Sequence, residues 1–141
     1  MKSKIALAYR HIVVSLLISF GILENSRAAF VETDIGGGSD GAVIPVQNGY
    51  DVSSRSRDIG GNNDQFEFGN ETRSGNFDVQ ARLEGITITD PFVQGGLMAR
   101  ESLTPGARFA GVFSSSALLS SFFESRNAAS AATQTSTAPR G

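Results

Sequence analysis

The sequence predicts an all-β fold, an antiparallel β-sandwich. Apolar and polar residues alternate with a period of two through the middle of the chain, which is typical of strands with one buried face. The candidate strands recur at short intervals and are separated by Gly, Ser and Asn, which supply turns. The chain has 141 residues, with 16 glycines, 10 phenylalanines and no cysteine. We therefore expect one domain that is held together without disulfides.

The first segment, residues 1–28, has the pattern of a secretory signal peptide. Lys2 and Lys4 precede the apolar run Ile12–Leu23, which is shorter than the roughly 20 residues that span a bilayer. Small residues lead up to Ala28, so we expect cleavage after Ala28 and no membrane contact afterwards. An uncleaved N-terminal anchor is the alternative. Cleavage predicts a secreted, cell-surface or periplasmic protein.

Residues 29–126 are expected to form the domain. Its lead, Val31–Asp58, is rich in glycine and polar residues. We predict a loop there with two short edge strands, AVIPV and YDV. Pro45 suits an edge strand because it has no N–H to donate to a neighbouring strand.

A β-hairpin is predicted next. In its first strand, QFEFG, Phe66 and Phe68 point to the core, and we expect Glu67 and Glu71 to face water. The second strand, Phe77–Leu83, alternates in the same way, and a Gly-Asn pair before it supplies the turn.

The remaining strands are predicted to form an antiparallel meander over Val93–Glu101, Arg108–Ser114 and Leu118–Arg126. A short amphipathic helix is the alternative for the last of them. Residues 127–141 are biased to Ala, Ser and Thr, so we predict a disordered tail or an unfinished loop there.

Composition argues against an enzyme. The single histidine, His11, lies in the predicted signal peptide, which leaves no Ser/His/Asp triad and, without cysteine, no zinc site. A glycosidase needs two carboxyl groups about 5 to 9 Å apart, and Asp64 and Glu67 fall on opposite faces of a regular strand. We interpret these carboxylates as exposed strand charges. The net charge of -2 also makes nucleic acid an unfavourable partner.

One turn, RDIGGNND, carries the oxygen ligands that calcium prefers. The ligands would be Asp58, Asn62 and Asp64, with two glycines permitting the bend. A turn stabilised by Asp and Asn side chains alone is the alternative. No other cofactor is expected.

Three motifs carry a resemblance to a known family: "YDVSSRSRDIGGNNDQFEF", "SGNFDVQARLEGITITDPFVQGGLMARES" and "PGARFAGVF". In this order they resemble the uncharacterised lectin-like domains of the concanavalin A-like lectin/glucanase superfamily, found in large secreted bacterial proteins. The similarity covers Asp34–Phe113 and is closest in GLMARES. Where the family usually has Trp, this chain has Gly60 and Phe92.

The resemblance implies a two-sheet jelly roll without catalytic residues, which binds carbohydrate or packs against neighbouring domains. Such domains ordinarily continue through further strands, so the chain looks C-terminally truncated and we expect an incomplete sandwich. For a bound glycan the expected contacts are Gln80, Arg82, Phe92 and Arg100. For Arg100 and Glu101 the alternative is that they form structural pairs at the end of a sheet. A structural spacer that binds no glycan is the alternative function, followed by a glycoside hydrolase.

Overall fold

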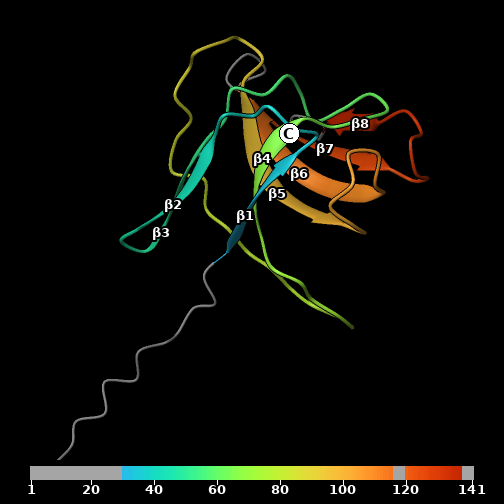
Figure 1. Cartoon of the computed structure of the whole chain (residues 1–141), viewed down its shortest axis with the longest axis horizontal. Coiled ribbons are helices and arrows are strands. Elements are labelled where there is room, and N and C mark those ends of the chain that lie inside the picture. The colour runs from blue at the N-terminus through green and yellow to red at the C-terminus, as the bar shows by residue number, and fades with distance from the viewer. Residues whose placement is uncertain (1–29, 116–119, 138–141) are drawn as a thin grey trace, which may run out of the picture.

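The computed structural model describes residues 30–115 and 120–137, and in these residues every regular element is a β-strand in an antiparallel sheet (Figure 1). The all-β prediction is confirmed. The strands are β1 (Val31–Ile35), β2 (Ala42–Val46), β3 (Gly49–Ser53), β4 (Phe66–Asn70), β5 (Gln94–Arg100), β6 (Phe109–Ser115), β7 (Ser120–Arg126) and β8 (Gln134–Thr137).

The strands form two packed layers with a hairpin beside them. β1 pairs with β4, β2 pairs with β3, and β5 to β8 form a four-stranded sheet in chain order. Figure 1 shows β1 and β4 lying across one face of the larger sheet. Ile35 and Phe66 from the small sheet meet Phe109, Phe113 and Phe122 from the large one in the hydrophobic core. This arrangement is consistent with a β-sandwich.

The predicted meander is present as β5, β6 and β7, and its last segment is a strand, so the helical alternative is wrong. The register places Gly96, Phe113 and Phe122 side by side on the core face. A Cβ atom at Gly96 would lie 2.1 Å from the carbonyl oxygen of Val112. Glycine is required there because β5 and the Phe113 backbone approach so closely.

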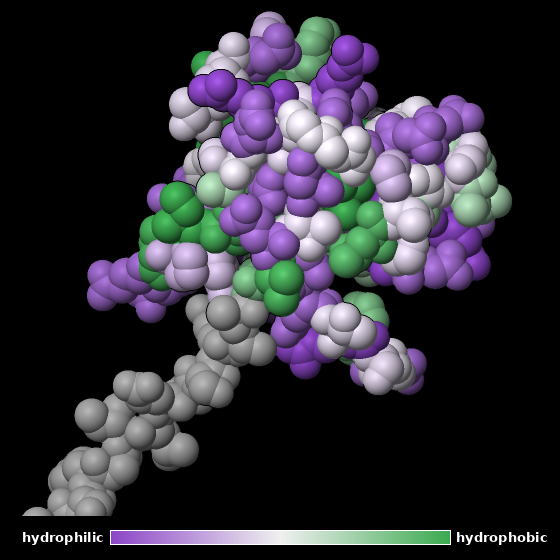
Figure 2. Space-filling model, viewed as in Figure 1, coloured by the Kyte–Doolittle hydropathy of each residue, from purple (hydrophilic) through white to green (hydrophobic). Residues whose placement is uncertain are grey.

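The predicted edge strands AVIPV and YDV are β2 and β3. They form a hairpin in register from Ala42↔Ser53 to Val46↔Gly49. Figure 2 shows apolar side chains gathered over this hairpin, where Ile44 is exposed.

The predicted hairpin after β3 is wrong in its second strand. β4 pairs with β1, from Val31↔Asn70 to Ile35↔Phe66, and Phe77–Leu83 forms no strand. The alternation in a strand shows that one face is apolar, but it does not show which strand lies beside it. β1 was missed because its only fully buried side chain is Ile35.

Three further expectations need correction or lie outside the described residues. Glu67 is buried and accepts a hydrogen bond from the Ser39 hydroxyl, so it does not face water. β8 lies in the predicted tail, where the pairing Glu124↔Thr135 orders the chain. The predicted signal peptide and its cleavage at Ala28 lie outside the described residues. Within those residues, no helix is long and apolar enough to cross a membrane.

Candidate functional site

A buried ion cluster of Asp64, Arg100 and Arg126 lies at one end of the sandwich. Asp64 is fully buried, and its two carboxylate oxygens accept hydrogen bonds from Arg126 at 2.6 and 2.9 Å. Arg100 donates to the same carboxylate at 3.2 Å and its side chain is 2% exposed. The two-pronged Arg126 contact is the strong geometry for such a pair, because one guanidinium donates two parallel N–H···O bonds to one carboxylate.

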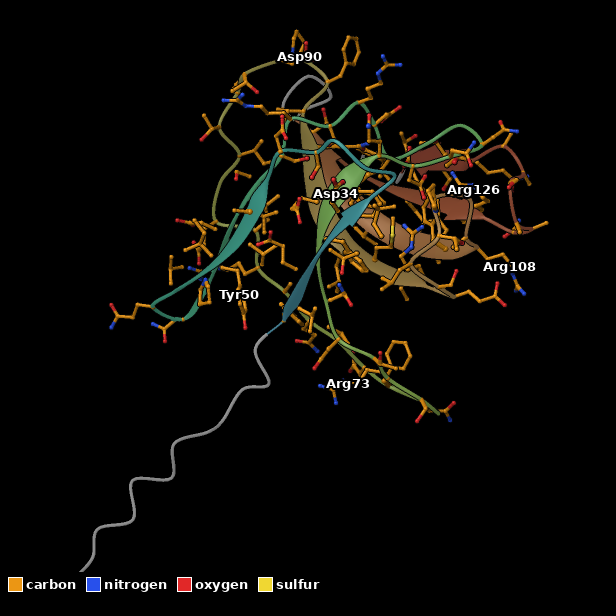
Figure 3. The ribbon with its side chains drawn as sticks, viewed as in Figure 1. Asp34, Tyr50, Arg73, Asp90, Arg108 and Arg126 are labelled. Carbon is orange, nitrogen blue, oxygen red and sulfur yellow. The ribbon has the colours of Figure 1, made fainter. Side chains whose placement is uncertain are left out.

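The Arg126 guanidinium also ties together segments that are distant in the sequence. It stacks over the Phe109 ring, 5.1 Å from its centroid. Its remaining donors reach main-chain oxygens in three loops, those of Gly60, Gly61, Pro105, Ala107 and Ala131. Since buried donors without acceptors destabilise a fold, these five carbonyls are what makes a buried arginine tolerable here. Figure 3 shows Arg126 lying within the sheet region.

Arg100 carries the second positive charge of the ion cluster. Burial lowers the pKa of Arg100, while the neighbouring Asp64 carboxylate opposes that shift. Its guanidinium lies over the Phe66 ring, 5.3 Å from the centroid, and donates to the carbonyls of Ser102 and Thr104. The ion cluster thus holds two cations and one anion in fixed geometry and acts as a structural device.

Two more carboxylates lie near the ion cluster. Asp58 accepts a hydrogen bond from the Gln94 amide at 3.0 Å, and burial raises the pKa of Asp58. Glu124, on the core face of β7, is buried; its Oε1 accepts from Thr135 and its Oε2 lacks a partner among the described residues. Burial raises the pKa of Glu124, with the charges of Asp58 and Asp64 adding to the effect.

The predicted calcium ligands already make contacts within the protein. Asp64 binds two guanidinium groups, Asp58 binds Gln94, and the Asn62 amide donates to the carbonyl of Ser130 at 3.0 Å. In the described part of the chain, no three Asp, Glu or His side chains are grouped closely enough to hold a metal. A calcium ion at Asp64 would have to displace both arginines.

The predicted glycan contacts do not share one surface. Gln80, Arg82 and Phe92 lie on the exposed segment between β4 and β5, and Phe92 is 79% exposed. Arg82 pairs with Glu84. Arg100 instead turns into the core to meet Asp64. Figure 3 shows Asp90, near Phe92 in sequence, well separated from Arg126.

The opposite face of the four-stranded sheet, here called the outer face, presents a different set of side chains. Because side chains alternate across a strand, the register gives rows that run across β5, β6 and β7. These rows are apolar (Leu97, Val112, Phe123), small (Ala99, Ala110, Ser125) and, just beyond the strand ends, polar (Glu101, Arg108, Asn127).

An open depression of about 470 Å³ lies over the small row of the outer face. Phe123 borders it and is 44% exposed, although it sits on a sheet strand. Arg108 and Glu101 close the other end, with their charged atoms 3.9 Å apart. Figure 3 shows Arg108 extending away from the end of the sheet. An aromatic ring, a hollow and a polar rim are thus brought together.

Sequence reasoning assigned most phenylalanines to the core and so missed this face. The signal is the adjacent pair Phe122 and Phe123, because neighbours in a strand point to opposite sides. One of the two must leave the core, and it is Phe123.

Comparison of the chain with protein-family models, with curated proteins and with solved structures finds no match.

Proposed function

We propose that this chain is a non-catalytic, lectin-like module that binds carbohydrate through the outer face of its four-stranded sheet. The observation that carries the proposal is the exposed Phe123 ring beside a hollow lined by small residues. A sugar ring has an apolar C–H face and a rim of hydroxyls. The C–H face would stack on Phe123, and the hydroxyls would reach the Arg108 guanidinium, the Glu101 carboxylate and the Asn127 amide.

The ion cluster supports this site from the other side of the sheet. Ser125 and Asn127 contribute to the depression, while the intervening Arg126 side chain is anchored to Asp64 and to loop carbonyls in the interior. A binding face that is rigid before the ligand arrives loses less entropy on binding. Preorganisation matters here because the platform is a single phenylalanine, with no tryptophan in the chain.

The carboxylates favour binding over hydrolysis. A glycosidase places two carboxyl groups across the scissile bond. Among the described residues that line the depression, Glu101 is the one carboxylate, and it faces Arg108. Export by the predicted signal peptide would bring the outer face into contact with extracellular polysaccharide.

The test is a glycan array followed by isothermal titration calorimetry on any hit, with and without calcium. Phe123→Ala should weaken binding about tenfold, since loss of an aromatic stack and its buried area removes about 1.4 kcal/mol. Phe92→Ala is the control: it removes a ring of the same kind, more exposed than Phe123, that lies off the outer face, and it should leave the affinity unchanged.

The alternative function is a spacer that packs against a neighbouring domain, and the apolar row of Leu97, Val112 and Phe123 favours it as a second candidate. If no glycan binds in either condition, or if Phe92→Ala weakens binding as much as Phe123→Ala, the glycan site on the outer face is rejected. If no glycan binds in either condition, the spacer remains.

A further inference from the structure

The segment between β4 and β5 presents a strand pattern that has no partner strand among the residues the structure describes. Every residue from 72 to 85 is exposed, including the large apolar side chains of Phe77, Val79 and Leu83. Among the described residues, no backbone hydrogen bond involves residues 76–86. Fourteen exposed residues in succession would be unremarkable in a polar loop, but here they include a regular alternation of apolar and polar side chains.

This alternation is the pattern of a half-buried strand. In Phe77–Leu83, called here the pairing segment, Phe, Val, Ala and Leu occupy alternate positions, with Asp78, Gln80 and Arg82 between them. An exposed segment of high β-propensity with free N–H and C=O groups readily pairs with another strand. The remaining question is which strand pairs with this segment.

We propose that the pairing segment joins antiparallel to the same segment of a second copy of this chain, forming a twofold dimer. With Gln80 on the twofold axis, Asp78 of each copy lies opposite Arg82 of the other. On the other face, Phe77 meets Leu83 and Val79 meets Ala81. The sequence is therefore complementary to itself in both charge and apolarity, which is what a symmetric interface requires.

The neighbouring registers are disfavoured by charge. Shifting one copy by two residues in one direction places Asp78 of each copy opposite Glu84 of the other. Like charges directly opposite one another destabilise a strand pair. Shifting it the other way leaves Asp78 and Arg82 facing neutral side chains. A shift by one residue would put the apolar side chains of the two copies on opposite faces.

The present partner of Arg82 does not prevent this pairing. Arg82 and Glu84 form an ion pair at 2.6 Å, but their side chains are 82% and 74% exposed. Exposed pairs of this kind contribute little to stability. Arg82 can therefore turn to the Asp78 carboxylate of the second copy across the interface.

The experiment is sedimentation equilibrium with the secreted form of the chain. Wild type should be a dimer, while Asp78→Arg and Arg82→Asp should each raise the dimer dissociation constant about tenfold or more, because both symmetric pairs become repulsive. The double variant, Asp78→Arg with Arg82→Asp, restores both pairs and should restore the dimer. Asp51→Arg, an equal charge change at an exposed position on β3, is the control and should have no effect.

Circular dichroism of each variant shows that its fold is intact, which we expect because the changed side chains are exposed. The proposal is overturned if the wild type is a monomer at high micromolar concentration. Pairing of this segment with β5 of its own chain would give that result. It is also overturned by a double variant that stays monomeric, or by open-ended assemblies larger than the dimer.

Discussion

The strongest test of the fold concerns the ion cluster, through the substitution Asp64→Asn. Asparagine keeps the shape of the side chain and removes the charge that Arg126 contacts at 2.6 Å and Arg100 at 3.2 Å. Two guanidinium groups then remain buried without a counter-ion, and breaking one partner of a buried pair costs about 3 to 5 kcal/mol. The whole domain is expected to be stable by only about 5 to 15 kcal/mol. We expect a fall in melting temperature of about 15 °C or more.

The assay is thermal and urea unfolding followed by far-ultraviolet circular dichroism. Glu84→Gln is the matched control, since it neutralises a carboxylate that contacts an arginine at the same 2.6 Å but in an exposed pair. That variant should lie within about 0.5 kcal/mol of wild type. The reasoning is refuted if Asp64→Asn lies within about 1 kcal/mol of wild type, or if the two variants are equally destabilised.

Two further predictions concern β7 and β5. Burial raises the pKa of Glu124 above its ordinary 4.5. The protonated group therefore stabilises the fold fully below pH 4.5. This contribution is lost as the pH rises through the folded-state pKa. Glu124→Gln should therefore be more stable than wild type at neutral pH, with the gap closing on acidification in urea titrations; a constant gap would contradict this. Gly96→Ala places a Cβ 2.1 Å from the Val112 carbonyl oxygen and should destabilise by about 1 to 3 kcal/mol. Its neighbour Gly95→Ala meets only Leu83 at 3.9 Å and should be nearly neutral in the same melts, so equal losses would rule out the steric argument.

The strands that were predicted well follow one another closely in the sequence. The meander of β5, β6 and β7 was found within two residues of its predicted bounds, because consecutive antiparallel strands pair with their neighbours in sequence. The pairing of β1 with β4 brings together residues that are far apart in the sequence, such as Ile35 and Phe66. No local sequence pattern indicates which distant strand pairs with β4. Phe77–Leu83 was therefore predicted to be its partner, whereas the partner is β1.

The buried charges could not be predicted for the same physical reason. Glu67 reads as a solvent-facing residue until Ser39, 28 positions away, is placed against it. Asp64 and Arg126 are 62 positions apart, and each taken alone has the character of a surface residue. Phe123 shows the reverse case, because an apolar residue in a strand reads as core until the covered face of the sheet is known.

The ion cluster and the outer face are connected through the register of β7. A slip of β7 by one residue against β6 would turn Phe123 and Ser125 inward and Phe122, Glu124 and Arg126 outward, which would put charged side chains into the small row of the depression. The Arg126 guanidinium prevents this, since it is fixed to Asp64 and to five carbonyls that do not belong to the sheet. A well-packed apolar residue at position 126 could match the stability of the buried pair, but it would lack the directional contacts that hold one register. The buried charges therefore contribute specificity of strand alignment, which keeps Phe123 on the outer face.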